Sequence, residues 1–259
     1  MKMFEDPPKP SQALKDEYEA LVKVDEKILN ISEENHKQIM KDLARTYPSY
    51  KVFKSEKTQK KLENVLRAFS NKFHDICYFQ GMNFIVGFFL YHCEEYISYA
   101  MFVSLFEECE LRYLFTSGFP GLKLHTDNVR NIVKANYSDI DYLFTTLKVN
   151  LEIVLVEWLY SLFSSTIPLE AQYDFYFGFI NQKWEFFYKM CISCFLELEG
   201  KFNEADDVYI ALKFIQHKDD TATTTTQFWK GIIKRAYQLK FKWSIIVYTL
   251  YMHVIYINK

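Results

Sequence analysis

The sequence has little glycine and proline, with seven and six residues among 259. Folds with many tight turns, such as β-sandwiches, barrels and propellers, need more of both. A strong charge of either sign is also missing, because 31 lysines and arginines balance 33 aspartates and glutamates. A near-neutral chain does not attract nucleic acid through its overall field, so we expect no such partner. Five cysteines, an odd number, favour a reduced protein over a disulfide framework.

Several motifs that can be read from sequence are missing as well. GxxxxGK[ST], GxGxxG and GxSxG do not occur, which excludes a P-loop NTPase, a Rossmann enzyme and a serine hydrolase. The one CxxC, Cys191 to Cys194, has no second pair for zinc and is typical of core packing. His92 and Glu95 could face one metal ion, but a di-iron bundle needs that motif twice. A helical metalloprotein is therefore one alternative, and we expect no metal and no cofactor of the chain's own.

Aromatic residues are abundant instead, and the apolar residues recur with a helical period. One predicted helix buries Leu62, Val65, Leu66, Phe69 and Phe73 and points Lys60, Lys61, Glu63, Asn64 and Arg67 outward. Another buries Trp184, Phe187, Tyr188, Cys191, Phe195 and Leu198, with Gly200 at its C-terminal cap. The apolar runs 84–91 and 151–163 predict helices that are buried all round. We therefore expect an all-α fold.

The two ends of the chain differ from the middle. Residues 1–14 form a polar segment without the apolar stretch of a signal peptide, so we expect a cytoplasmic protein. We place the helical domain at residues 15–240, with Lys218–Gln227 as a candidate linker. Residues 241–259 form an apolar tail whose 15-residue stretch 243–257 is shorter than the roughly 20 residues that span a bilayer. We expect the tail to pack on the domain, with membrane contact as the alternative.

Two polar groupings are not explained by helix packing, and the first is Ile39-x-x-Asp42-x-x-Arg45-Thr46. Pro48 disfavours α geometry at the residue before it, so the helix should end there. Asp42 and Arg45 are three residues apart and within reach of each other. The aspartate would orient an arginine that projects past the helix end. The simpler interpretation is an exposed ion pair that suits the C-terminal dipole.

The second grouping is Tyr78-x-Gln80-Gly81-Met82-Asn83. A glutamine and an asparagine among aromatic residues need partners if they are buried, since each unsatisfied group costs about 1–3 kcal/mol. Gly81 marks a backbone turn or a close approach. The simpler interpretation is a buried amide with satisfied hydrogen bonds.

Together the two groupings resemble the paired signature of the TBC domain, the GTPase-activating domain for Rab-family GTPases. The resemblance covers about residues 15 to 238 and implies an all-helical fold of two lobes, with the GTPase docked in a groove. In that family the arginine of the first motif and the glutamine of the second enter the active site of the bound GTPase. The matching residues here are Arg45 and Gln80. The supporting positions would be Asp42, Tyr78, Gly81 and Asn83.

The resemblance also implies the biological setting. The chain would not be an enzyme itself but would supply catalytic residues in trans, and Mg²⁺ and GTP would arrive with the partner. Such a protein would act in vesicle trafficking and intracellular protein transport, from the cytoplasm, recruited to endomembranes by peripheral association. No tryptophan precedes Trp158, so the Arg- and Trp-bearing helix with which the family usually opens is absent or diverged. A non-catalytic Rab-binding scaffold with a TBC-like fold is therefore the alternative.

Overall fold

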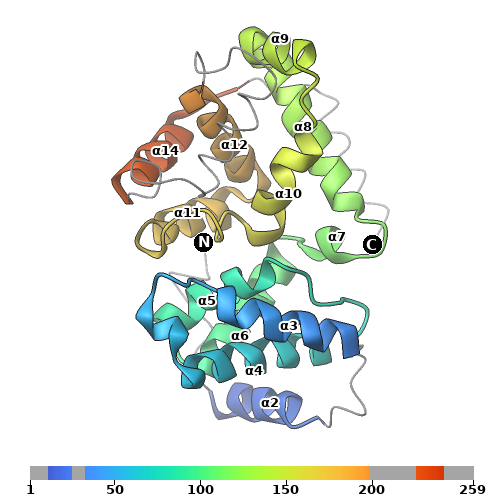
Figure 1. Cartoon of the computed structure of the whole chain (residues 1–259), viewed down its shortest axis with the longest axis vertical. Helices are drawn as coiled ribbons and strands as arrows, with labels where there is room; N and C mark the ends of the chain where they lie inside the picture. Colours follow the sequence, from blue (N-terminus) through green and yellow to red (C-terminus); the bar gives the residue numbers. More distant parts are fainter. Residues whose placement is uncertain (1–10, 25–32, 199–225, 242–259) are drawn as a thin grey trace. The chain divides into compact units, whose positions relative to one another are not determined.

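The computed structural model describes residues 11–24, 33–198 and 226–241, and all regular secondary structure in these ranges is helical (Figure 1). The predicted all-α fold is confirmed. The helices are α2 (Gln12–Val22), α3 (Glu33–Arg45), the 3₁₀ helix η1 (Lys51–Lys54), α4 (Glu56–Lys72), α5 (Met82–His92), α6 (Glu95–Glu108), α7 (Arg112–Phe115), α8 (Pro120–Asn136), α9 (Ser138–Thr146), α10 (Leu151–Ser161), α11 (Leu169–Gln182), α12 (Trp184–Leu198) and α14 (Thr226–Gln238).

The chain divides into two compact units, as the resemblance implied. Unit 1 takes its described residues from 1–121 and 157–181, and unit 2 takes them from 122–156 and 182–259. The chain therefore leaves unit 1 near the start of α8 and re-enters it within α10. Both candidate motifs lie in unit 1.

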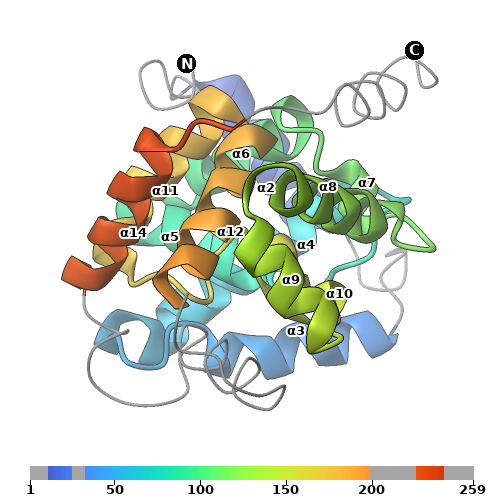
Figure 2. The same ribbon diagram turned by 90° about the horizontal axis from the view of Figure 1, so that it is seen from above.

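Unit 1 is built around α4, which contacts α2, α3, α5, α6 and η1 and lies between α2 and α3 in both ribbon views (Figures 1 and 2). The predicted apolar face of α4 is confirmed, because all five of its apolar residues are buried. The prediction that Glu63 and Arg67 point outward is wrong, since both are buried. Few directions around a helix with so many neighbours remain open to solvent. Glu63 instead pairs with Lys60 at 3.0 Å and with Arg67 at 3.6 Å.

Unit 2 contains the pair α12 and α14, which lie side by side (Figure 2). The predicted apolar stripe of α12 is buried from Trp184 to Phe195, and both cysteines of the CxxC are buried, as core packing requires. Burial raises the pKa of each of these thiols. The side chain of Leu198 and Gly200 lie outside the described residues.

The apolar runs formed helices that are less completely buried than predicted. In α5 most side chains are buried, but Tyr91 is 44% exposed. In α10 Ile153 is 62% exposed, and the helix ends at Ser161, before the end of the run. An apolar run predicts a core helix without showing which single positions reach the surface.

Some predictions concern segments outside the described ranges. These are the polar segment as far as residue 10, residues 218–225 of the candidate linker, and the tail from residue 242 onward. Among the described helices, none combines the length and the apolar character needed to cross a membrane.

Candidate functional site

The first motif lies at the end of α3, whose last residue is Arg45. Two residues later Tyr47 adopts a left-handed φ of 45° directly before Pro48, so the chain leaves the helix there. Tyr47 is buried, and its ring lies 5.3 Å from that of Phe84 on α5. Its hydroxyl lies 2.8 Å from the Phe84 carbonyl oxygen and 3.0 Å from Oε1 of Gln172, and it can donate to either. The end of α3 is therefore fixed to α5 and α11.

Asp42 lies on α3, one helical turn before Arg45, and is fully buried. Its Oδ2 accepts a hydrogen bond of 2.6 Å from the Tyr78 hydroxyl, and its Oδ1 accepts one of 2.9 Å from Nε2 of Gln38. Its Oδ1 also pairs with the Arg45 guanidinium. The simpler interpretation of an exposed ion pair is thus wrong for the aspartate. A buried carboxylate needs such donors, because an unpaired buried charge is strongly destabilising.

Burial and the neighbouring Asp42 carboxylate also determine the protonation state of Tyr78. Burial raises the pKa of its hydroxyl, and the hydrogen bond to Asp42 raises it further. The hydroxyl therefore stays protonated and keeps donating to the carboxylate.

The second motif forms the turn that leads into α5. Gly81 is the N-terminal cap and has a φ of 118°, which side-chain-bearing residues rarely adopt. A Cβ at Gly81 would lie 2.5 Å from the carbonyl oxygen of Tyr160, so the close approach predicted for this glycine is confirmed. The ring of Phe79, on the other side of Gln80, stacks on the Tyr160 ring at 4.1 Å.

Asn83 connects the two motifs. It is fully buried, its Oδ1 accepts from the Gly81 backbone N–H at 3.0 Å, and its Nδ2 donates to Oγ1 of Thr46 at 2.8 Å. The Thr46 hydroxyl in turn donates to the Asp42 carbonyl oxygen at 2.7 Å. The prediction of a buried, satisfied amide is confirmed for Asn83. Hydrogen bonds therefore run continuously from α3 to the turn.

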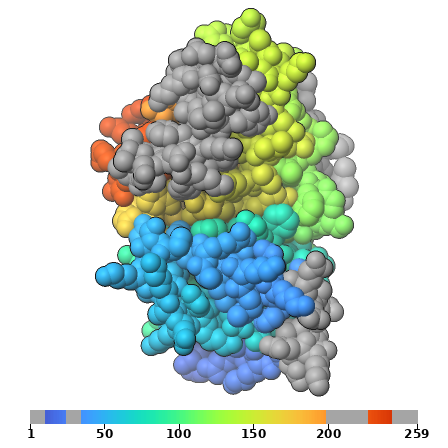
Figure 3. Space-filling view, in the orientation of Figure 1, coloured from blue at the N-terminus to red at the C-terminus, as the bar shows by residue number. Residues whose placement is uncertain are grey.

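Gln80 and Arg45 are the exposed members of this assembly. Gln80 is exposed and makes no hydrogen bond within the described part of the chain, so the interpretation as a buried amide is wrong for it. The Arg45 side chain is 46% exposed, although its partner carboxylate is buried. Among the signature residues of the two motifs, these two long polar side chains are therefore presented to solvent from a buried, hydrogen-bonded base. The surface of α3 is visible in the space-filling view (Figure 3).

Three residues of this base were not predicted from the sequence. Gln38 could have been found, because it lies one helical turn before Asp42. Tyr160 and Gln172 could not, because they lie far along the chain from the residues they contact.

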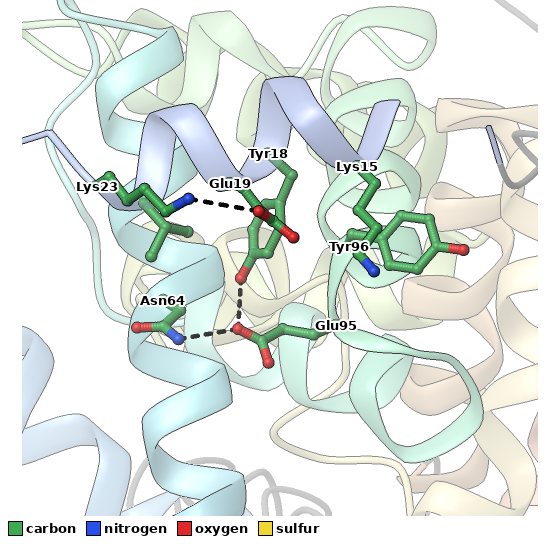
Figure 4. Close-up of a pocket in the computed structure, with 8 residues that line it drawn as sticks. Lys15, Tyr18, Glu19, Lys23, Asn64, Glu95 and Tyr96 are labelled. Carbon is green, nitrogen blue, oxygen red and sulfur yellow. Dashed lines mark hydrogen bonds and ion pairs between the residues drawn. The ribbon is translucent and has the colours of Figure 1, made fainter. Parts of the chain in front are cut away.

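His92 and Glu95 do not converge on a metal site. Glu95 points into a cavity of about 290 Å³ between α2, α4 and α6, where its Oε1 accepts from the Tyr18 hydroxyl at 2.6 Å and from Nδ2 of Asn64 at 2.9 Å (Figure 4). His92 packs against the rings of Phe88 and Tyr91. No group of three His, Cys, Asp or Glu side chains in the described ranges is placed to hold a metal ion.

Comparison with protein families identifies the domain. The model of the Rab-GTPase-TBC domain matches residues 7–202. The chain belongs to this family. A helix, α2, does precede the first motif of this TBC domain, but it contains neither arginine nor tryptophan.

The curated relatives are distant and much longer. The chain is 31% identical over 158 residues to the Rab GTPase-activating protein eat-17 of Caenorhabditis elegans, covering 61% of this chain and 18% of that protein. It is 25% identical over 242 residues to the human ecotropic viral integration site 5 protein homolog, covering 89% of this chain and 28% of the other. The TBC domain described here thus spans less than a third of either relative.

Solved structures share the fold. The crystal structure of the Ypt/Rab-GAP domain of Gyp1p superimposes with a TM-score of 0.69 at 16% identity, covering 88% of this chain and 78% of that one. The Chlamydomonas flagellar RabGAP TBC domain superimposes with a TM-score of 0.71 at 15% identity, covering 91% and 75%. At such identities the likeness shows a common fold.

Proposed function

We propose that this TBC domain stimulates GTP hydrolysis by a Rab-family GTPase and that Arg45 and Gln80 enter the GTPase active site. The observation that carries the proposal is the contrast between these two exposed side chains and the buried network beneath them. Family membership supports the partner class, and the pair of motifs supports the activity. The chain would work from the cytoplasm at endomembranes, in vesicle trafficking.

The chemistry of phosphoryl transfer explains why two such side chains suffice. Catalysis depends on positioning and on stabilising charge that develops around the transferred phosphoryl group. A guanidinium supplied in trans is worth about 10³–10⁵ in rate, or roughly 4–7 kcal/mol of activation free energy. Arg45 supplies this charge in the proposal. Gln80 orients the attacking water, a task that Ras-type GTPases give to a glutamine of their own.

The buried network prepares both side chains before the partner arrives. Asp42 holds the guanidinium through a carboxylate that is itself fixed by Tyr78 and Gln38. Gly81 and Asn83 fix the turn that carries Gln80. Preorganisation of this kind reduces the entropy lost when reacting groups are brought into place. The nucleotide and Mg²⁺ belong to the partner in this proposal.

The test is single-turnover phosphate release from a panel of GTP-loaded Rab-family GTPases, with and without the purified chain. We expect strong acceleration of at least one member. Binding of a GTPase to the wild-type chain without any acceleration would favour the non-catalytic scaffold and refute the proposal.

A further inference from the structure

The loop between α7 and α8 contains an unusual aromatic residue, Phe119. Gly118 has a φ of 82° and Phe119 a φ of 49°, so two successive residues are left-handed. Phe119 also precedes Pro120, and a residue in that position is normally driven toward extended backbone. A bulky side chain in the left-handed region is conformationally costly.

Burial offsets this conformational cost at other large apolar residues with positive φ, but less so at Phe119. Tyr47, Leu162 and Phe163 are the other large apolar residues with positive φ in the described ranges, and all three are buried. Phe119 is 42% exposed. Asparagine or glycine would fit the backbone here with less strain. Strained residues of this kind cluster at functional sites, where the strain serves binding or catalysis.

The position of Phe119 indicates what it serves. Its ring lies 5.4 Å from that of Phe79, edge to face, and 6.1 Å from that of Tyr160. Phe79 is the residue directly before Gln80, and Tyr160 supports the same turn through Gly81. Phe119 therefore packs against the residue next to Gln80 and against the support of the same turn. Aromatic residues, phenylalanine among them, are enriched in the cores of protein interfaces.

We infer that Phe119 is an affinity-determining contact for the GTPase, packing on an apolar side chain at the rim of its nucleotide pocket. The inference rests on the proposed function and adds a residue that neither signature motif contains. In this arrangement Arg45 and Gln80 act on the reaction, whereas Phe119 acts on the stability of the complex.

The decisive variant is Phe119→Asn, because asparagine removes the ring and tolerates the left-handed backbone. Single-turnover hydrolysis is measured against activator concentration, next to thermal melting. We expect the half-saturating concentration to rise at least tenfold, the rate at saturation to stay within twofold, and the melting temperature to stay equal or increase. Phe119→Tyr keeps the ring and should behave like the wild type. Phe177→Ala removes another phenylalanine ring with 39% exposure, from α11, and should leave the half-saturating concentration unchanged.

Each contrary result has a distinct meaning. An unchanged half-saturating concentration in Phe119→Asn overturns the inference and leaves the proposed function standing. So does a lower melting temperature with activity lost in proportion to the folded fraction, because the ring would then be structural. A fall only in the saturating rate also overturns it. Absence of acceleration by the wild-type chain across the panel overturns both proposals at once.

Discussion

At the scale of single residues, the site depends on one buried carboxylate. Asp42 is inaccessible to solvent, yet it pairs with an arginine whose side chain is nearly half exposed. Two further donors, from Tyr78 and Gln38, compensate the loss of hydration. The partners of Asp42 therefore differ in setting: Tyr78 and Gln38 donate hydrogen bonds to its carboxylate, and Arg45 pairs with it from a partly exposed position.

Replacing Arg45 tests the proposed charge stabilisation directly. Arg45→Ala removes the guanidinium but leaves Asp42 with two donors, so we expect helical content and GTPase binding to be preserved although the free energy of unfolding falls. Stimulated hydrolysis should fall by about two orders of magnitude or more. Arg45→Lys should behave similarly, because an ammonium lacks the planar fork. Circular dichroism, a binding titration and single-turnover hydrolysis give the three readouts.

Arg112 provides a matched control for this experiment. Its side chain has the same 46% exposure, lies in the same unit and is paired with Asp75. Arg112→Ala should retain stimulation within a few fold. Survival of stimulation within tenfold in Arg45→Ala would reject Arg45 as the catalytic arginine.

Replacing Tyr78 tests the buried side of the network. Tyr78→Phe keeps the ring but removes the hydroxyl that donates to Asp42, which leaves a buried carboxylate short of one donor. We expect the free energy of unfolding to fall by about 1–3 kcal/mol, measured by urea denaturation. Tyr142→Phe is the control, since Tyr142 is 73% exposed and should show no change. Equal stabilities of Tyr78→Phe and wild type would mean that the hydrogen bond contributes nothing to folding.

At the scale of secondary-structure elements, the turn before α5 is the most constrained part of the site. Gly81 combines a φ of 118° with a backbone contact that excludes any side chain. The turn is clamped from one side by Tyr160 and from the other by the Asn83 amide. Gln80 therefore projects from this constrained turn, between the packed residues Phe79 and Gly81.

Gly81→Ala should break this turn. The added methyl would clash with the Tyr160 carbonyl oxygen and demand an unfavourable φ, so we expect a loss of about 2 kcal/mol or more in unfolding free energy. Gly231→Ala is the matched control, because a Cβ there meets no atom within 4 Å and Gly231 lies inside α14. That variant should gain about 0.5–1 kcal/mol, since glycine is destabilising within a helix. Calorimetric melting of both variants distinguishes the two cases, and a Gly81→Ala protein as stable as wild type would contradict the observed packing.

At the scale of the whole molecule, the sequence predicted the helices better than the packing around them. The apolar periodicity of α4 was sufficient to identify its core face, but it could not show that neighbours also enclose Glu63 and Arg67. The two motifs were recognisable because each is local in the chain. The residues that support the motifs were not recognisable, since they are distant in the chain: Tyr47 hydrogen-bonds to Gln172, 125 positions away. Contacts of that kind depend on tertiary packing, which periodicity does not encode.

The role of Gln80 is a property of the complex and needs variants of both proteins. If Gln80 orients the water, the GTPase's own switch glutamine is dispensable during stimulated turnover. A cognate Rab with that glutamine changed to alanine should then still be accelerated by the wild-type chain. Gln80→Ala should abolish acceleration of both the normal and the altered Rab. Because Gln80 is exposed and makes no hydrogen bond within the described ranges, its loss should leave the melting temperature unchanged.

Single-turnover hydrolysis of the four pairings, together with melting curves, separates this mechanism from Ras-type activation. In Ras-type activation the GTPase glutamine positions the water, so the altered Rab would not respond to the wild-type chain. Gln80→Ala would then still accelerate the normal Rab. Such a result would mean that Gln80 is a surface residue of the turn and takes no part in hydrolysis. We expect the wild-type chain to accelerate the altered Rab and Gln80→Ala not to do so. This expectation follows from the two exposed side chains that the buried network supports.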